Sequence, residues 1–272
     1  MLDEVCFVTY DMAKALVQNY HYSQVLPRLT KECVGGFIGN KLVAVATLGY
    51  GVRPLHTIRK IFPTLGVKDY LELGKLCLSD YCKRNTESYF ISQMIKKLKE
   101  KRPELKLLFS WADGILGKPG YVYQASNFLY GGFIWTEMYL DKDNVRVHPR
   151  TLQGISDRKG KGRLGSRSYE TTTEMGLKKY FGLQFRYVYP LCHKKEWKRL
   201  LETSPCEWTT KYPKDSDCKW KVQTAKGERM ECDKPESVAT EYTKGIVREQ
   251  KQAGFFARKR DREANKYVWV NR

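Results

Sequence analysis

The sequence predicts an α+β fold, built on one mixed but mostly antiparallel sheet flanked by helices. Segments with strand and helix patterns alternate along the chain, beginning with a strand, a helix and an antiparallel meander. Hydrophobic residues make up 42% of the chain and aromatic residues 13%, as is typical of a folded globular protein. We expect residues 1–203 to form this domain and residues 204–272 to form a basic C-terminal extension.

The first fifty residues predict a strand, a helix and a hairpin. Residues 4–9 are mostly apolar or β-branched, which favours a strand. Asp11 is expected to cap a helix that continues to Tyr20. Residues 32–38 and 42–50 flank the turn pair Gly39-Asn40, which is typical of a β-hairpin.

The middle of the chain predicts three strands and two helices. Residues 72–79 alternate in polarity and residues 105–111 form a short apolar run, so both are expected to be strands. Asn85 is expected to cap a helix through Lys101, because its apolar residues recur with helical spacing. A helix over 122–129 and a strand over 133–140 follow.

The remaining segments predict a helix over 170–180, a strand over 183–190 and a helix over 194–202. This order of elements is that of the GCN5-related N-acetyltransferase (GNAT) fold. Beyond residue 203 the pattern becomes polar, and only residues 240–265 are expected to be helical. The extension is interpreted as a DNA-binding appendage or as a packing extension, and the pattern leaves the choice open.

Basic residues exceed acidic residues by a wide margin. Lys and Arg number 49 against 30 Asp and Glu, a net charge of +19, and the excess is concentrated in the second half of the chain. A glycine-rich loop at residues 145–167 holds one acid and these cations: Arg146, Arg150, Arg158, Lys159, Lys161, Arg163 and Arg167. We expect this loop to hold a DNA backbone through contacts that are sensitive to salt and indifferent to sequence. The alternative is a solvated insertion.

The compartment and the metal content are constrained less strongly. No apolar run approaches the roughly 20 residues of a membrane span, so we expect a soluble protein without a membrane partner. Eight scattered cysteines without CxxC pairs favour a reducing cytoplasm. Cys206, Cys218 and Cys232 match no compact zinc spacing with His193, so no metal ligand is assigned. The metal requirement and the oligomeric state stay open.

Several short blocks occur together in a specific order. They are NYHYS (19–23), ELGKLCLSD (72–80), KRNTESYFIS (83–92), SWAD (110–113), GYVYQASNFLYGG (120–132), FRYVYPL (185–191) and KYPK (211–214). In this series the chain resembles the Mom family of phage DNA-modification proteins over residues from about 15 to 214. The resemblance implies a GNAT-like fold and a transferase that adds a carbamoylmethyl group to the N6 of adenine. It implies double-stranded DNA as the substrate, protection of that DNA from restriction enzymes, and a place in the host cell cytoplasm.

Two departures from the family pattern bear on the group donor. The family usually has arginine where this chain has Lys75, which keeps the charge and loses the planar fork of the guanidinium. The glycine-rich pyrophosphate loop of ordinary acyl-CoA acetyltransferases is replaced here by KRNTES. The helix start at Asn85, with Ser88 and Arg84, is still expected to hold an anionic part of the donor. The donor itself is left open, with acetyl-CoA as one candidate by fold analogy.

The junction FSWADGILGKPGYVYQASNF (109–128) supplies the candidate site. Asp113 follows a buried strand and is expected to accept a proton from N6, with Tyr123 and Lys75 as the other catalytic residues. A base taken out of the duplex also needs stacking and edge hydrogen bonds. The residues expected to supply them are Trp111, Gln124, Ser126, Asn127, His21 and Tyr22.

The spacing of Glu72 and Lys75 raises a structural condition. Residues three apart in a regular strand point to opposite faces, so these two side chains share a wall only if a β-bulge intervenes. Gly74 makes such a bulge feasible.

Two other functions are compatible with the same pattern. One is an acyl- or aminoacyl-transferase that acts on RNA or protein. The other is a catalytically inactive DNA-binding protein on the same scaffold, which the Lys75 departure favours.

Overall fold

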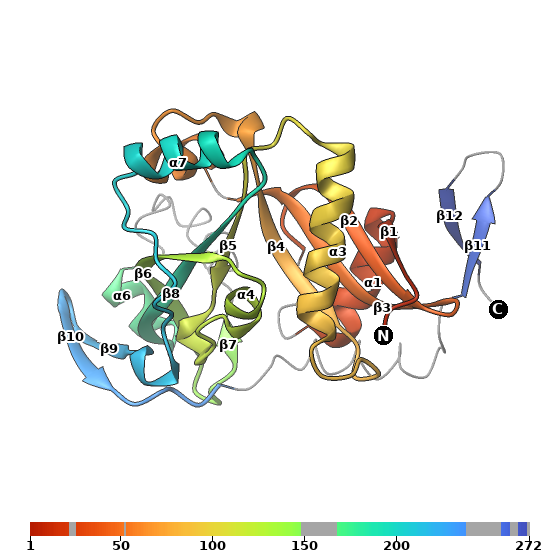
Figure 1. Ribbon diagram of the computed structural model, residues 1–272. Helices are drawn as coiled ribbons and strands as arrows, with labels where there is room; N and C mark the ends of the chain where they lie inside the picture. Colours follow the sequence, from red (N-terminus) through yellow and green to blue (C-terminus); the bar gives the residue numbers. More distant parts are fainter. Residues whose placement is uncertain (22–25, 52, 148–167, 238–256, 262–265, 271–272) are drawn as a thin grey trace.

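The computed structural model describes residues 1–21, 26–51, 53–147, 168–237, 257–261 and 266–270, the last two ranges by their backbone alone. Within these residues the chain forms one large twisted sheet with helices on its faces and ends (Figure 1). No helix in the described part of the chain is both long and apolar enough to cross a lipid bilayer.

The sheet is mostly antiparallel, which confirms the predicted fold class. Its central order is β1-β2-β3-β4-β5-β8-β6-β7, and β4 with β5 is the parallel pair within that order. The strands are β1 (Glu4–Phe7), β2 (Leu29–Ile38), β3 (Lys41–Tyr50), β4 (Tyr70–Leu78), β5 (Leu107–Ala112), β6 (Leu129–Leu140), β7 (Arg146–Val147) and β8 (Lys178–Pro190).

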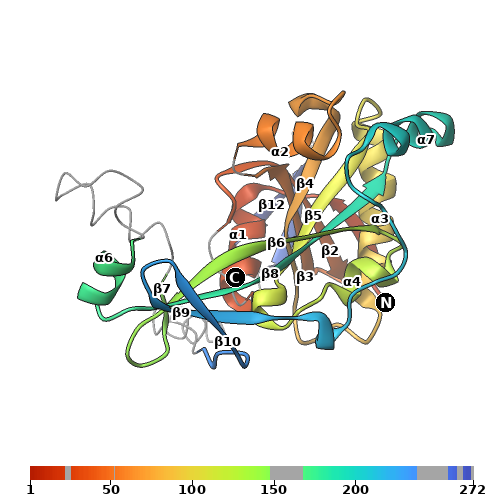
Figure 2. The ribbon, with the colours of Figure 1, turned by 90° about the vertical axis from the view of Figure 1, so that its left-hand side faces the viewer.

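Two helices cover opposite faces of the β1–β4 part of the sheet (Figure 2). On one face, α1 (Tyr10–Tyr20) buries Met12 and Leu16 against β2, β3 and β4. On the other face, α3 (Thr86–Lys101) places its buried apolar side chains at helical spacing: Phe90, Ile91, Met94, Ile95 and Leu98. The strands between them are therefore apolar on both faces.

The start of α1 corrects one expectation. The helix begins at Tyr10, and its cap is Thr9, whose side-chain oxygen accepts a hydrogen bond from the Met12 amide at 3.3 Å. Asp11, expected as the cap, lies in the first helical turn. There its negative charge interacts favourably with the positive end of the helix dipole.

Helices α2 (Pro54–Ile61) and α7 (Lys194–Thr203) lie together at one end of the sheet, at the top of Figure 1. They share a buried cluster with β5, in which Phe62 contacts Trp197 at 5.7 Å between ring centroids. The sequence patterns did not reveal α2. Proline at its first position is compatible with a helix start, because that amide has no helical acceptor.

The segment after residue 203 continues the same folded body. The Trp208 ring stacks on Phe62 at 5.3 Å and covers Gly131, where it leaves no room for a Cβ. The Tyr212 hydroxyl donates to the Phe128 carbonyl at 2.8 Å. Strand β9 (Trp220–Ala225) then pairs with β8 and with β10 (Glu228–Cys232). The division expected at residue 203 is therefore not marked by a break in packing.

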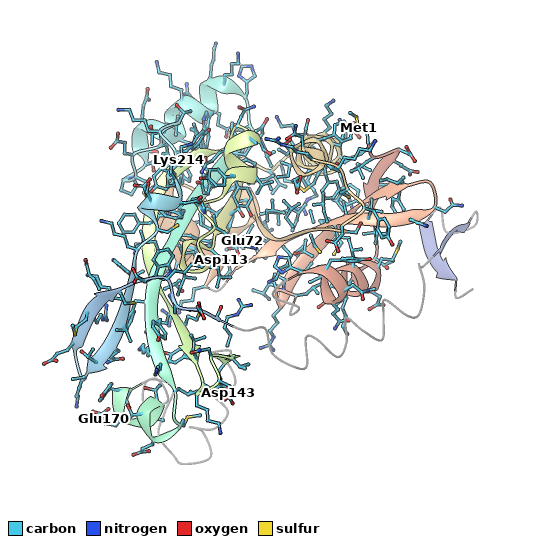
Figure 3. The ribbon with its side chains drawn as sticks, turned by 90° about the horizontal axis from the view of Figure 1, so that it is seen from below. Met1, Glu72, Asp113, Asp143, Glu170 and Lys214 are labelled. Atoms are coloured by element: carbon cyan, nitrogen blue, oxygen red, sulfur yellow. The ribbon has the colours of Figure 1, made fainter. Side chains whose placement is uncertain are left out.

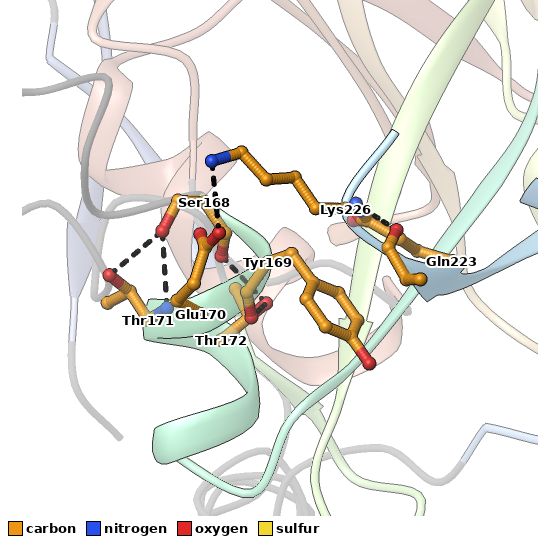
Figure 4. Close-up of polar contacts among 8 residues, drawn as sticks. Ser168, Tyr169, Glu170, Thr171, Thr172, Gln223 and Lys226 are labelled. Atoms are coloured by element: carbon orange, nitrogen blue, oxygen red, sulfur yellow. Dashed lines mark hydrogen bonds and ion pairs between the residues drawn. The ribbon is translucent and has the colours of Figure 1, made fainter. Parts of the chain in front are cut away.

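The described chain resumes after the basic loop at α6 (Tyr169–Glu174), which is fastened at its start (Figure 4). Ser168 caps the helix by accepting from the Thr171 amide at 3.2 Å. Two contacts tie α6 to the β9–β10 hairpin, namely the Tyr169 hydroxyl to the Thr224 carbonyl at 2.8 Å and Glu170 to Lys226 at 3.4 Å. The start of α6 is thus held on the hairpin.

Several boundaries differ from the predicted ones for reasons of backbone geometry. The helix expected over 122–129 is the short α4 (Tyr121–Ala125), because Asn127 adopts φ +60° and the chain then enters β6. Likewise α6 ends at Glu174, and Gly176 at φ +66° leads into β8. Part of the helix expected over 240–265 is instead strand β11 (Ala257–Asp261), which pairs with β12 (Lys266–Val270). In the described part of the chain, the short 3₁₀ helices are Val67–Asp69, Gly114–Leu116 and Asp215–Asp217.

Candidate active site

A cavity of about 580 Å³ opens where β4 and β5 diverge. The two strands pair over three residue pairs, the last of which joins Glu72 to Phe109, and beyond it the strands separate. The cavity is lined by β4 from Glu72 to Leu78, by the end of β5 and by the loop that leads into α4. Glu72 and Asp113 both line it, and Figure 3 shows them close together near the middle of the molecule.

A β-bulge at Gly74 places Glu72 and Lys75 on the same cavity, which confirms the condition set by their spacing. In the pairing with β3, Thr47 lies opposite Lys75 while the next residue, Leu48, lies opposite Leu73. Gly74 is thus the extra residue. A Cβ at Gly74 would lie 2.7 Å from Pro27 Cγ, so the close approach of the segment before β2 also favours glycine here.

Asp113 is held at the end of β5 by its strand partner. Ala112 pairs with Phe185 in β8, so the following residue, Asp113, comes opposite Gln184. The Gln184 side-chain amide donates to Asp113 Oδ1 at 3.3 Å. The Asp113 backbone carbonyl in turn accepts from the amides of Leu116 and Lys118, which fixes the loop that begins there. The carboxylate is therefore oriented toward the cavity by a neighbouring strand.

Burial shifts the charge states of two β4 side chains in opposite directions. Loss of hydration raises the pKa of the Glu72 carboxyl to about 7. Loss of hydration lowers the pKa of the Lys75 ammonium to about 8, although the nearby Asp113 charge opposes that shift. Both groups can therefore change protonation near neutral pH, which is a property of acid–base sites.

Tyr123 and Trp111 contribute a hydroxyl and a flat apolar surface. Burial raises the pKa of Tyr123 to about 12, so its hydroxyl stays protonated at neutral pH and acts as a hydrogen-bond donor. Trp111 is packed edge-on against Phe109 at 5.0 Å. The Arg186 guanidinium lies over the Trp111 ring, 5.5 Å from its centroid. This contact holds the indole from one side.

The end of α1 supplies another part of the lining. His21 and Tyr20 line the cavity, and burial raises the pKa of Tyr20 above its usual value. His21 lies directly after the helix, where its amide donates to the Val17 carbonyl at 3.0 Å. Tyr22, expected to contact the base, lies outside the described residues.

Three residues expected at the base lie elsewhere. Gln124 donates to the Tyr187 hydroxyl at 3.1 Å and to the Pro213 carbonyl at 3.0 Å, so it joins α4 to the segment after residue 203. Ser126 donates to the Val122 carbonyl within its own helix at 2.7 Å. Asn127 is exposed in a left-handed turn. None of the three lines the cavity, because Gln124 and Ser126 are bonded to other groups and Asn127 is exposed.

The start of α3 presents charges of both signs. Asn85 occupies the cap position at φ +68° without a side-chain capping bond, and Arg84 is exposed beside it. Ser88 donates back to the Asn85 carbonyl at 3.1 Å. Glu87 is the side chain of this helix start that lines the cavity, and its carboxylate would repel a pyrophosphate. The Glu87 carboxylate therefore opposes binding of a pyrophosphate at this helix start, while Arg84 would favour it.

Within the basic loop, Arg146 is the one predicted DNA contact that the structure describes. It lies on β7. Burial is the main cause of the lowered pKa of Lys75 and of Lys118, and the Arg146 charge adds to it. The other predicted contacts lie outside the described residues: Arg150, Arg158, Lys159, Lys161, Arg163 and Arg167.

Gln184, Glu87 and Lys118 line the cavity and were not predicted. Gln184 and Glu87 give no local signal, since one sits in a buried strand and the other in an ordinary helix start. Lys118 lies within the quoted junction, and its position in a glycine-rich loop was the available hint. All eight cysteines are free, and the described residues contain no group of three or more His, Cys, Asp or Glu side chains arranged for a metal ion.

The arrangement is suited to moving a proton beside a flat ligand. Asp113 is an oriented carboxylate, and Glu72 and Lys75 titrate near neutrality. The protonated Tyr123 hydroxyl, which is hydrogen-bonded to Ser110, and the Trp111 ring also belong to the lining residues. A set of this kind fits transfer of a group to a weakly nucleophilic nitrogen.

The chain matches known proteins in sequence and, to a smaller degree, in structure. Residues 4–214 match the sequence profile of the Mom protein family. A protein of Escherichia phage Mu named methylcarbamoylase mom is 32% identical over 144 residues, which cover 53% of this chain and 59% of that protein. The match thus spans less than two thirds of the relative's length.

Two acetyltransferases are among the similar solved structures. One, from Bacillus subtilis in complex with CoA, has a TM-score of 0.36 at 12% identity, over 70% of this chain and 99% of its own. The ribosomal-protein-S18-alanine N-acetyltransferase from Escherichia coli has a TM-score of 0.38 at 10% identity, over 70% and 94%. The fold assignment rests on the strand pairing described above and not on these scores.

Proposed function

Because the chain belongs to the Mom protein family, we propose that it is a phage-type DNA-modifying transferase that adds a carbamoylmethyl group to the N6 of adenine. The name of the phage Mu relative, methylcarbamoylase, supports this reaction. In this proposal the modification protects the DNA from restriction enzymes, and the protein works in the cytoplasm of the host cell.

The observation that carries the proposal is the cavity between β4 and β5. Its volume of about 580 Å³ lies within the usual range for small-molecule sites, which is wide enough for one base. An enzyme that modifies N6 must extrude the adenine, because N6 is paired inside the duplex. Trp111 offers a face for the extruded ring, and Asp113 stands at the same wall.

The reaction needs one proton to leave the amino group. The N6 lone pair forms a bond to an electrophilic carbon of the donor, the bond from that carbon to its carrier breaks, and the carrier departs with the electron pair. Asp113 accepts the proton from N6, and Gln184 keeps the accepting carboxylate in place. The Tyr123 hydroxyl donates a hydrogen bond to the base or to the donor, since it stays protonated at neutral pH.

The donor is proposed to bind beside Lys75 and the start of α3. The Lys75 charge would offset an anionic part of the donor, with Asn85, Ser88 and Arg84 at the adjoining helix start. Acetyl-CoA stays one candidate by analogy of fold, but Glu87 opposes its pyrophosphate at this position. The mass of the group found on DNA would identify what the donor transfers.

Double-stranded DNA is proposed to bind along the basic parts of the chain. Residues 145–167 and 204–272 carry a large share of the net charge of +19. Arg146 lies close enough to the cavity to influence Lys75, so the basic loop begins beside the proposed reaction site. A strand held there would have its phosphates near the extruded base.

The test is a mass measurement on nucleosides. DNA from cells that express the chain, and from matched cells that do not, is digested and analysed by liquid chromatography and mass spectrometry. We expect a deoxyadenosine heavier by one carbamoylmethyl group in the expressing cells alone. Unmodified deoxyadenosine in both would contradict the proposal, and a modified nucleoside in RNA would support the RNA transferase instead.

A further inference from the structure

A second cavity of about 460 Å³ adjoins the main one. Lys118 lines both cavities, so the two spaces meet at its side chain. The second cavity is also lined by the cations Arg146 and Lys234, and by the apolar side chains of Ile115 and Leu116. It therefore combines three positive charges with an apolar wall.

The fold brings these three cations from distant parts of the chain. Lys118 lies on the loop between β5 and α4, Arg146 on β7, and Lys234 on the segment that follows β10. The Lys234 side chain lies across Gly117, with its Nζ 3.0 Å from the place where a Cβ would stand. Gly117, at φ +71°, lets that loop turn and leaves the space that Lys234 occupies.

The other two cations lie close enough to Lys118 to affect its charge state. Burial lowers the pKa of Lys118, and the charges of Arg146 and Lys234 lower it further, while Asp113 opposes the shift. Glu236 also lines the cavity and is exposed. A bound anion would interact favourably with all three cations and would favour the charged form of Lys118.

We propose that the second cavity binds a phosphate group, namely the backbone phosphate next to the nucleotide whose base enters the main cavity. This inference rests on the proposed function for its choice of DNA as the source. The cations suit a phosphodiester, and the wall formed by Ile115 and Leu116 suits the apolar edge of a sugar. Because Lys118 lines both cavities, it would link the base to its own backbone. Phosphates of the donor are the other source of the same chemistry.

The test compares DNA binding by charge variants when no donor is present. Lys118→Gln, Arg146→Gln and Lys234→Gln are measured by fluorescence anisotropy with a labelled duplex over a range of salt concentrations. The matched control is Lys96→Gln, because Lys96 is exposed on α3 and lines neither cavity. We expect several-fold weaker binding and a salt slope smaller by about 0.9 for each site variant, with little change for the control.

A second arm distinguishes the source of the phosphate and guards against misfolding. Coenzyme A is titrated against the same variants, and Lys118→Arg and Lys234→Arg, which keep the charge, are expected to restore binding. Weaker DNA binding alone assigns the site to the nucleic acid, and weaker coenzyme A binding alone assigns it to the donor.

The proposal is overturned if the three site variants fold and bind both ligands as tightly as Lys96→Gln does. If any of them fails to fold, binding by the charge-retaining variants Lys118→Arg and Lys234→Arg is compared with wild type instead. The proposal is also overturned if added inorganic phosphate does not weaken DNA binding by the wild-type protein. A failure of the proposed function alone would give a different result. The site variants would still bind DNA more weakly than wild type, but the wild-type protein would leave deoxyadenosine unmodified.

Discussion

Lys75 occupies a position at which charge and reactivity compete. The bulge at Gly74 turns its side chain into the cavity, where burial lowers its pKa to about 8. The Lys75 side chain is therefore charged at pH 7, and it loses its proton and its charge as the pH rises through about 8. If the donor has an anionic part, binding weakens over the same range.

The variant Lys75→Arg separates charge from proton transfer. A guanidinium stays protonated throughout the accessible pH range, so a purely electrostatic role predicts that the alkaline loss of activity near pH 8 moves to higher pH. The measurement is the pH profile of the modification rate on duplex DNA. An unchanged position of the alkaline limb would show that another group, and not Lys75, sets it.

Glu72 links the cavity to the stability of the whole chain. Its folded-state pKa is raised from 4.5 to about 7, so the folded protein holds this proton more tightly than the unfolded chain does. The stabilising contribution is therefore fully present below about pH 4.5 and is lost as the pH rises through about 7. Around neutral pH the ionised carboxylate is a local cost of the site.

We predict that Glu72→Gln removes this cost. The difference in free energy of unfolding, variant minus wild type, should be about 1–3 kcal/mol larger at pH 8 than at pH 5. This corresponds to several degrees in Tm. Thermal unfolding followed by circular dichroism at the two pH values gives the comparison. Glu228→Gln, an exposed carboxyl on β10, is the control. Equal pH dependence in wild type and Glu72→Gln would contradict the assignment.

At the scale of single elements, the loop before α4 depends on a glycine. Gly120 lines the cavity at φ +97°, and a Cβ there would lie 2.7 Å from Tyr187 Cε2 and 2.8 Å from Ala112 Cβ. The Tyr187 hydroxyl donates to the Pro119 carbonyl at 2.5 Å, so the ring cannot withdraw without releasing the loop. Both backbone strain and crowding oppose a larger residue.

The variant Gly120→Ala tests this packing against a matched glycine. Gly132 has φ +81° and no neighbour within 4 Å of a Cβ, so Gly132→Ala carries the backbone strain alone. We expect Gly132→Ala to cost about 1 kcal/mol and Gly120→Ala to cost about 2 kcal/mol or more. Urea unfolding measures both free energies. Equal losses would mean that the Tyr187 ring yields freely.

Elements with a strong local pattern were predictable from the sequence. The β2–β3 hairpin followed from its Gly39-Asn40 turn, and α3 from its apolar spacing. The bulge at Gly74 followed from requiring Glu72 and Lys75 on one wall. Helix ends were less predictable, because the end of α4 is set by the left-handed backbone of Asn127 and not by a change in residue type.

The parts of the site that depend on long-range pairing could not be predicted. Gln184 faces Asp113 because β8 lies antiparallel to β5, a neighbour relation that skips two strands in the sequence. Lys234 reaches Gly117 because the chain returns beside the loop after β10. Conversely, nearness in sequence to Asp113 led to the expectation that three further residues contact the adenine base: Gln124, Ser126 and Asn127. The turn of the chain carries all three away from the cavity.

At the scale of the whole molecule, the charge predicts how binding responds to salt. The chain has a net charge of +19, and residues 145–167 contribute seven cations, Arg146 among them, against one acid. Each phosphate contact that releases a counterion adds about 0.9 to the slope of log affinity against log salt. The helix that follows these residues, α6, contacts the β9–β10 hairpin through Tyr169 and Glu170.

Replacing the seven Lys and Arg residues of this segment by Gln should lower the salt slope by several units and weaken binding to all sequences alike. Fluorescence anisotropy with two unrelated duplexes between low and moderate salt provides the measurement. A variant with seven exposed cations replaced outside residues 145–167 is the control for net charge. An equal loss in the control would assign the effect to overall charge and not to this segment.

The proposed role of Asp113 is tested most directly by Asp113→Ala, with DNA binding and deoxyadenosine modification measured on the same protein. The control is Asp143→Ala, whose side chain is exposed in the β6–β7 turn at a distance from the cavity (Figure 3). We predict that Asp113→Ala binds duplex DNA about as tightly as wild type and forms no modified deoxyadenosine, while Asp143→Ala does both. Modification that continues in Asp113→Ala, or loss of DNA binding together with activity, would contradict a proton-accepting role for this carboxylate.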